Sequence, residues 1–237
     1  MEYSFDHMIF SDNIICQPKE GGFRFGCDSP ILAYFTKAKK NWHVADVGSG
    51  SGIIASLIYR IYGSKVTAIE LQPEMFSCLE RTVNMNNYSE NISIINRNIK
   101  DIKKEYAFDA VVCNPPYRNL NTGKIAPDVV SNIARFTMEM NIEDLVLFAK
   151  RNLKNNGKLF FSYDADLLSD ALFICKKNNL EPKRLLFLHK DINSKAKLVF
   201  VECSLNGGVE LTIEPPLIQT GDENITRPYN NIFNGIW

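Results

Sequence analysis

The segment WHVADVGSGSG, residues 42–52, decides the fold of this chain. Its first half is short and apolar, and a turn with glycines at 48, 50 and 52 follows at once. Apolar residues then recur at helical spacing over 53–62. Glycine permits positive φ and lets backbone amides approach a ligand closely. The segment therefore predicts a strand, a glycine turn and a helix, with a ligand at the turn; a tight turn without a ligand is the alternative.

The rest of the chain alternates in the same way between β-branched apolar segments and segments of helical spacing. Further strands are predicted at 65–71, 92–95, 108–113, 158–163, 184–188 and 197–205, and further helices at 74–87, 99–106, 142–153 and 167–178. Such alternation favours a doubly wound α/β fold, a mostly parallel sheet covered on both faces. We predict one domain over 1–237, with an N-terminal extension (1–41), a catalytic core (42–205) and a C-terminal tail packed on the core (206–237).

Composition excludes several classes of protein. Hydrophobic residues make up 45% and charged residues 23% of the 237, which is typical of a globular chain and not of a disordered one. With 27 basic and 27 acidic residues, a uniformly basic nucleic-acid coat protein is excluded, but a local basic face is not. The six cysteines form no metal-ligand spacing, so we expect reduced thiols and no metal. Without a signal-peptide pattern or an apolar run of ~20 residues, we expect a cytoplasmic protein with no membrane contact.

The acidic residues on either side of the turn identify the class of ligand. Glu70 ends the next predicted strand, 22 residues beyond Gly48, where doubly wound folds place a carboxylate on ribose hydroxyls. The third glycine follows the second by two residues, unlike the dinucleotide fingerprint, and no Gly-Lys-Ser/Thr of a P-loop is present. An adenosine ligand without phosphate, S-adenosylmethionine, fits better. Asp46 would face its charged amino-acid end.

A second motif, Asn114-Pro115-Pro116-Tyr117, ends the predicted strand at 108–113. The prolines remove two N–H donors, so the local backbone offers only carbonyl acceptors, and the Asn114 side-chain oxygen adds another. Acceptors that bond both hydrogens of an exocyclic NH₂ would push electron density onto its lone pair for attack on a methyl group. Tyr117 offers an aromatic face for stacking. We therefore predict Asn114, Pro115 and Tyr117 as catalytic, with a rigid strand-ending turn as the alternative.

At these residues the sequence resembles class I S-adenosylmethionine-dependent methyltransferases that act on amino groups, over nearly the whole chain. It is most similar to the bacterial tRNA1(Val) (adenine(37)-N6)-methyltransferases. Besides the two motifs, the similar blocks are FRFGCDS (23–29), NNGK (155–158), LEPKR (180–184) and EPPL (214–217). The Asn-Pro-Pro-Tyr motif by itself is shared by N6-adenine, N4-cytosine, N2-guanine and protein glutamine-N5 methyltransferases.

The resemblance implies a Rossmann-like, seven-stranded sheet whose last strand is antiparallel. It also implies that the glycine loop holds the methionine end of the cofactor, Glu70 the ribose, and 114–117 a flipped adenine. The candidate cofactor-binding residues are Asp46, Gly48, Gly50, Gly52, Glu70, Asn98 and Asn114. The candidate substrate-binding residues are Arg24, Phe25, Asp28, Pro116 and Tyr117. Two positions depart from the family: Asn98 stands for an acidic residue near the cofactor adenine, and ARFT (134–137) for Ala-Arg-His-Glu.

The expected activity is N6-methylation of an adenine in the anticodon loop of a tRNA, because a base leaves its stack most readily in a loop. Basic groups at 37/39/40, 100/103/104 and 150/151/154 are candidate phosphate contacts, although each also fits a solvated helix face. The alternatives are an N2-guanine RNA methyltransferase and a protein glutamine-N5 methyltransferase. The latter family usually has a separate N-terminal helical domain, whereas 41 residues precede the first core strand here. A non-catalytic binding module and a DNA adenine methyltransferase are less favoured.

Overall fold

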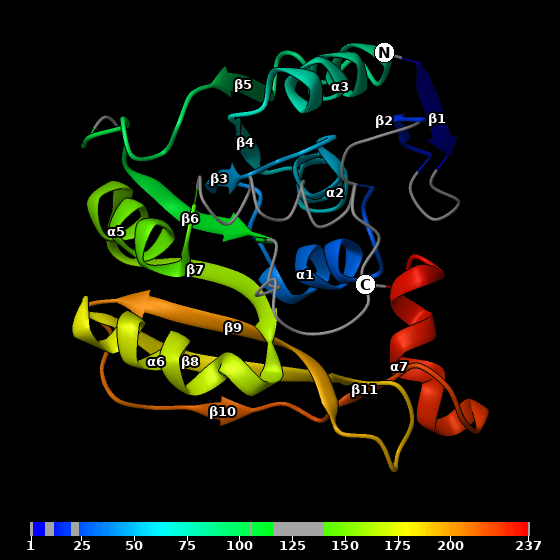
Figure 1. Ribbon diagram of the computed structural model, residues 1–237, viewed down its shortest axis with the longest axis vertical. Helices are drawn as coiled ribbons and strands as arrows, with labels where there is room; N and C mark the ends of the chain where they lie inside the picture. The colour runs from blue at the N-terminus through cyan, green and yellow to red at the C-terminus, as the bar shows by residue number, and fades with distance from the viewer. Residues whose placement is uncertain (1, 8–11, 20–23, 105, 116–139, 237) are drawn as a thin grey trace, which may run out of the picture.

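The alternating pattern folds into a twisted sheet with helices on both faces (Figure 1). The computed structural model describes residues 2–7, 12–19, 24–104, 106–115 and 140–236. The strands are β1 (Tyr3–His7), β2 (Ile14–Pro18), β3 (His43–Val47), β4 (Lys65–Glu70), β5 (Ile92–Asn96), β6 (Phe108–Cys113), β7 (Leu153–Asp164), β8 (Leu180–His189), β9 (Ala196–Leu205), β10 (Thr212–Ile213) and β11 (Leu217–Ile218). The helices are α1 (Asp28–Thr36), α2 (Ile53–Tyr62), α3 (Pro73–Met85), α5 (Ile142–Asn152), α6 (Leu168–Lys177) and α7 (Glu223–Phe233), with a short 3₁₀ turn at Ala165–Leu167.

The order of the strands is β10-β8-β9-β7-β6-β3-β4-β5, and β11 also pairs with β8. Strands β3 to β7 pair in parallel, and β9 lies antiparallel between β7 and β8. The predicted mostly parallel sheet with an antiparallel last strand is therefore confirmed, but in the described part of the chain the sheet has nine strands rather than seven. The two-residue strands β10 and β11, which extend the sheet beyond β8, were not predicted because segments this short carry no periodicity.

The register of the central strands aligns the ends that matter for function. Val47 of β3 pairs with Ile69 of β4 on one side and with Cys113 of β6 on the other. The residues that follow these three are Gly48, Glu70 and Asn114, which therefore lie at the same carboxyl edge of the sheet. Ligands of open α/β sheets bind in the crevice at this edge.

The two faces of the sheet bury separate cores, because successive side chains of a strand point to opposite faces. In β6, Ala110 and Val112 pack on the face covered by α1, α2, α3 and α7, while Val111 and Cys113 pack under α5 and α6. Each of these four side chains is at most 1% exposed. Polar groups near the carboxyl edge are thereby held by a rigid, closely packed support.

Local sequence explains where three of the described helices begin. Pro73 stands at the start of α3, where its missing N–H costs nothing. Helix α5 begins with a reciprocal capping box between Asn141 and Asp144. Helix α2 begins directly after Gly52, whose φ of 84° requires glycine, and an added Cβ would lie 2.6 Å from Leu79 Cδ1.

The helix predicted at 99–106 is wrong for the residues that the structure describes, which form turns at 99–101 instead. The Asn98 side-chain oxygen accepts a hydrogen bond from the Lys100 N–H (2.9 Å), and the Asn98 carbonyl accepts one from the Asp101 N–H (3.0 Å). Asparagine side chains compete in this way with helical backbone bonds. Ile99 and Ile102 are buried, so their apolar pattern anchors a turn rather than a helix face.

The N-terminal β1–β2 hairpin and the C-terminal helix α7 pack at opposite ends of the layer of helices that covers one face of the sheet (Figure 1). The β1–β2 hairpin lies against α3, where the Cys16 N–H donates to Thr82 Oγ1 (3.0 Å). Helix α7 packs against β11 and α1. In the described part of the chain, no helix has both the length and the apolar character to span a bilayer.

Candidate active site

The glycine loop between β3 and α2 is held against the end of β4. The N–H groups of Gly48 and Ser49 both donate to the Ile69 carbonyl, at 2.9 and 3.1 Å. The glycines at 48, 50 and 52 all have positive φ, between 57° and 84°. Because L side chains rarely adopt this conformation, these glycines allow the loop to turn tightly into the helix.

This loop and the Asn-Pro corner after β6 line one pocket. The pocket has a volume of about 580 Å³, part of it open to solvent, and Phe25 and Met140 contribute to its walls. A second pocket of about 360 Å³ adjoins it, with Gly48 and Met140 common to both. The first is lined by Phe25, Ser29, Gly48, Ser49, Gly50, Ser51, Ile53, Ile54, Asn114, Pro115 and Met140. The second is lined by Val47, Gly48, Ile69, Glu70, Leu71, Arg97, Asn98, Ile99 and Met140.

Asp46 lies beneath the glycine loop and is fully buried. Its Oδ2 accepts a hydrogen bond from the Ala55 N–H (3.1 Å), whereas its Oδ1 has no partner among the described residues. Burial raises the pKa of Asp46 to about 7 and Glu70 adds to this rise, while Ser49 and the Ala55 N–H lower it. A buried acceptor without a partner is costly. Asp46 is thus a buried acceptor beneath the loop, and it lines neither pocket.

Glu70 connects the glycine loop to the second pocket. Its Oε2 accepts the Gly50 N–H and its Oε1 accepts the Gln72 N–H, both at 2.8 Å. Each carboxylate oxygen can accept more than one hydrogen bond, so this arrangement is compatible with bonds to a pair of hydroxyls. Asn98 lines the same pocket, about half-buried, with its side-chain oxygen on the Lys100 N–H.

Asn114 stands at the end of β6 with its amide held at both ends. Its Nδ2 donates to Ser29 Oγ (3.0 Å), and its Oδ1 accepts from Ser162 Oγ (2.5 Å). Pro115 is buried and lines the first pocket. The predictions for Pro116 and Tyr117, and the ARFT block at 134–137, lie outside the described residues.

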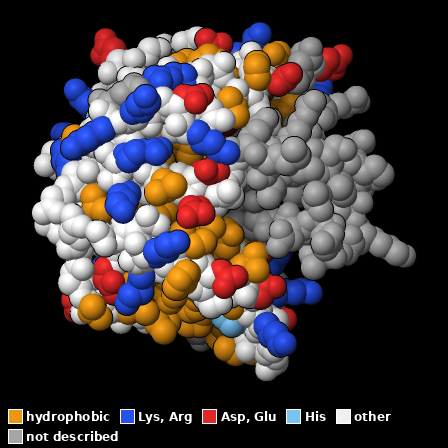
Figure 2. Space-filling model, turned by 60° about the vertical axis from the view of Figure 1, so that its left-hand side comes forward, with side chains coloured by type: hydrophobic (Ala, Val, Ile, Leu, Met, Phe, Trp, Pro, Cys, Tyr) orange, Lys and Arg blue, Asp and Glu red, His pale blue; other side chains and the backbone are white. Residues whose placement is uncertain are grey.

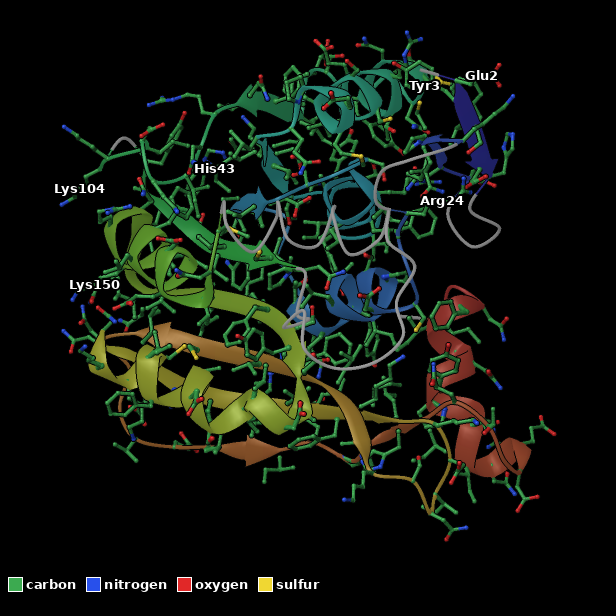
Figure 3. All side chains as sticks on the ribbon, viewed as in Figure 1. Glu2, Tyr3, Arg24, His43, Lys104 and Lys150 are labelled. Atoms are coloured by element: carbon green, nitrogen blue, oxygen red, sulfur yellow. The ribbon has the colours of Figure 1, made fainter. Side chains whose placement is uncertain are left out.

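The three predicted substrate residues before the sheet occupy different environments. Phe25 lines the first pocket, and its N–H donates to Gln17 Oε1 (3.2 Å). Arg24 turns away to the hairpin, as Figure 3 shows, and forms an ion pair with Asp6 (2.8 Å). Asp28 Oδ1 accepts the N–H of Ser29 (3.0 Å) in the first turn of α1. Of the three, the structure places only Phe25 in the pocket wall.

The predicted basic groups lie away from the pocket or are paired. Figure 3 shows Lys104 and Lys150 at the edge where His43 begins β3, which is the amino edge of the parallel strands. Figure 2, which brings this side forward, shows Lys and Arg side chains interspersed with acidic ones. Among the residues that the structure describes, ion pairs of these groups are Lys37–Glu214, Lys100–Asp144 and Lys154–Asp109.

Ser29, Ser162 and Met140 are site residues that the sequence did not single out for the pocket. Ser29 belongs to the FRFGCDS block, so the resemblance did contain a signal for it. The sequence contains no such signal for Ser162, which reaches Asn114 only because Cys113 pairs with Phe161 in the β6–β7 register. Among the described residues, no group of three His, Cys, Asp or Glu side chains is arranged to hold a metal ion.

Comparison with known proteins relates this geometry to two kinds of methyltransferase. A release factor glutamine methyltransferase of Flavobacterium psychrophilum is 30% identical over 174 residues, which are 68% of this chain and 59% of that protein. A tRNA1(Val) (adenine(37)-N6)-methyltransferase of Tolumonas auensis is 29% identical over 138 residues, 57% of each chain. A protein of the same name from Aliivibrio salmonicida is 21% identical over 185 residues, 78% of each chain. The chain therefore spans less than two thirds of the first two relatives.

Solved structures share the fold. A predicted O-methyltransferase from Agrobacterium tumefaciens superimposes with a TM-score of 0.70 at 19% identity, covering 88% of this chain and 96% of that one. A geranyl diphosphate methyltransferase in complex with S-adenosylmethionine gives a TM-score of 0.54 at 12% identity, covering 75% and 84%. Residues 27–173, well over half of the sequence, match the model of the methyltransferase small domain. By this match, the chain belongs to the methyltransferase small domain family.

Proposed function

We propose that this methyltransferase transfers a methyl group from S-adenosylmethionine to N6 of an adenine in a tRNA anticodon loop, as the tRNA1(Val) (adenine(37)-N6)-methyltransferases are named for doing. One observation carries the proposal. The glycine loop after β3 and the Asn114–Pro115 corner after β6 line the same pocket, so a donor held by one lies next to an acceptor held by the other.

The residues present fit the cofactor. The unpartnered Oδ1 of Asp46 would receive the ammonium of its amino-acid end, since a buried carboxylate needs a cationic partner. Glu70 would hold the ribose hydroxyls, and Asn98 would lie at the adenine in the adjoining pocket. When bound, S-adenosylmethionine supplies a methyl group activated by the positive charge on its sulfur.

The Asn114–Pro115 corner suits an amine acceptor. Amide and carbonyl oxygens accept the hydrogens of an NH₂ group but cannot remove a proton as a strong base would. Such acceptors align the amine and favour the positive charge that develops on its nitrogen during transfer. This chemistry applies equally to adenine N6 and to the side-chain amide of glutamine.

The walls of the first pocket favour a planar base over a flexible side chain. Phe25, Ile53, Ile54 and Pro115 make the lining mostly apolar around a few polar groups. Single-stranded RNA loops are commonly bound by stacking of extruded bases on aromatic rings. The proposal therefore gives Phe25 the role of a stacking surface for the adenine.

Three exposed lysines provide a charge-complementary site for RNA phosphates. Lys190 and Lys195 lie between β8 and β9, and Lys197 is the second residue of β9. Because β8 is parallel to β7 and ends here, this connection lies at the carboxyl edge of the sheet with Asn114. Lysines at this edge are better placed for a substrate than those at the amino edge.

A second candidate function, N5-methylation of a protein glutamine, is favoured by the 30% identity to a release factor glutamine methyltransferase. The two are separated by incubating the protein with methyl-labelled cofactor and either total tRNA or total protein from a strain lacking the gene. We expect label in N6-methyladenine of tRNA, and none with Asn114→Ala. Label in protein glutamine instead would replace the proposal with the second candidate.

A further inference from the structure

The amide of Asn114 is held by two serines from distant parts of the chain. Ser29 comes from the first turn of α1 and accepts the Asn114 NH₂, while Ser162 comes from β7 and donates to the Asn114 oxygen. Both serines are buried, with exposed fractions of 3% and 0%. Buried hydroxyls are retained at little cost only where they are hydrogen-bonded, and here both bonds meet on one side chain.

The fold holds each serine rigidly. The parallel register pairs Cys113 with Phe161, so Ser162 adjoins Asn114 across the ladder. Ser29 is fixed by the backbone of α1, where its N–H donates to Asp28 Oδ1 (3.0 Å). Two rigid elements, one helix and one central strand, therefore define where the amide lies.

An asparagine amide without such partners would rotate about its last side-chain bond, since this torsion is broad. Rotation out of the observed amide plane would turn the oxygen away from the acceptor amine. Hydroxyls on both sides hold the plane of the amide, and the observed bonds place the oxygen on Ser162 and the NH₂ on Ser29. A carbonyl oxygen can accept two hydrogen bonds, so the bond from Ser162 is compatible with a bond from a substrate N–H.

We propose that Ser29 and Ser162 are positioning residues of the transfer reaction, which orient the amide of Asn114 toward the acceptor amine. This inference rests on the proposed function, because it requires that the Asn114 oxygen accepts from the amine to be methylated. It adds two residues that do not themselves touch the reacting atoms. Preorganised acceptors avoid the cost of ordering at the moment of reaction.

Kinetics of single variants test the proposal on the acceptor that the labelling experiment identifies. We expect Ser29→Ala and Ser162→Ala each to lower kcat about tenfold, the usual scale for one hydrogen bond, with affinity for S-adenosylhomocysteine within about twofold of wild type. Ser162→Thr keeps the hydroxyl and should restore most of kcat. Ser56→Ala is the matched control, because Ser56 is equally buried and its hydroxyl has no partner among the described residues.

A second readout does not depend on activity. In protein labelled with ¹⁵N-asparagine, the Asn114 side-chain NH₂ signals are identified by their loss in Asn114→Ala. Their hydrogen exchange should accelerate in both serine-to-alanine variants and stay unchanged in Ser56→Ala.

If kcat and exchange both stay at wild-type values, the serines do not position the amide. Equal losses of kcat in Ser162→Ala and Ser162→Thr, with unchanged exchange, would also overturn the proposal. Absence of label in RNA with the wild-type protein refutes the proposed function instead.

Discussion

Replacement of Asp46 by Asn should make stability less dependent on pH. Asp46 is fully buried with one oxygen unpartnered among the described residues, and its pKa is about 7 against an ordinary value of 3.8. In the unfolded chain the carboxyl is ionised above about pH 4, whereas in the folded protein it keeps its proton up to about pH 7. The folded state therefore binds one more proton in this range, and raising the pH destabilises it.

The size of the effect follows from linkage. Each pH unit between the two pKa values costs the folded state about 1.4 kcal/mol, and less near either pKa, so this group removes about 3 kcal/mol of stability between pH 5 and pH 8. Above pH 7 the loss levels off at about 4 kcal/mol, the full difference between the pKa values. Asn has nearly the same shape and does not titrate, so Asp46→Asn should lack this dependence.

Urea denaturation of both proteins at pH 5, 6, 7 and 8 measures the prediction. The stability of Asp46→Asn relative to wild type should rise by about 3 kcal/mol from pH 5 to pH 8, because contributions of other groups cancel in the difference. Ser56→Ala, a neutral change at a buried site, should show a constant difference. A constant difference for Asp46→Asn as well would refute the raised pKa, and with it the need for a cationic partner at Oδ1.

Three further changes test the site. Glu70→Ala should weaken S-adenosylhomocysteine binding about 10- to 100-fold by calorimetry, as expected for lost bonds to a charged group, and unchanged affinity would remove Glu70 from the ribose site. Asn98→Asp should tighten the same binding several-fold. The Asn98 oxygen already accepts the Lys100 N–H, and Asp would supply a second oxygen as an acceptor for the adenine amine. Weaker binding would indicate instead that Asn98 donates to a ring nitrogen of the adenine. Changing Lys190, Lys195 and Lys197 together to Ala should raise the KM for tRNA. The slope of log KM against log salt concentration should fall by the equivalent of up to about three phosphate contacts. An unchanged slope would exclude these lysines from phosphate binding.

Much of the core could be predicted from local pattern. The strand Phe108–Cys113 and the helix Ile53–Tyr62 have the predicted bounds, since each has a clear apolar pattern and a clear stop in glycine, asparagine or proline. The helix expected at 99–106 failed because its isoleucines fit a buried turn as well as a helix face. Arg24 was placed at the substrate rim by its neighbourhood in sequence, but its charge is paired with Asp6 across the hairpin.

The chain's own order of residues decided the family, the glycine loop and the acceptor corner, because each depends on a few adjacent residues with special backbone or hydrogen-bonding properties. Tertiary structure alone decided which distant groups meet. That Glu70 would bond Gly50, that Asp46 would keep an unpartnered oxygen, and that Ser29 and Ser162 would hold Asn114 follow from strand order and register. Register depends on matching the buried faces of all paired strands at once, so the pattern of one segment by itself does not determine it.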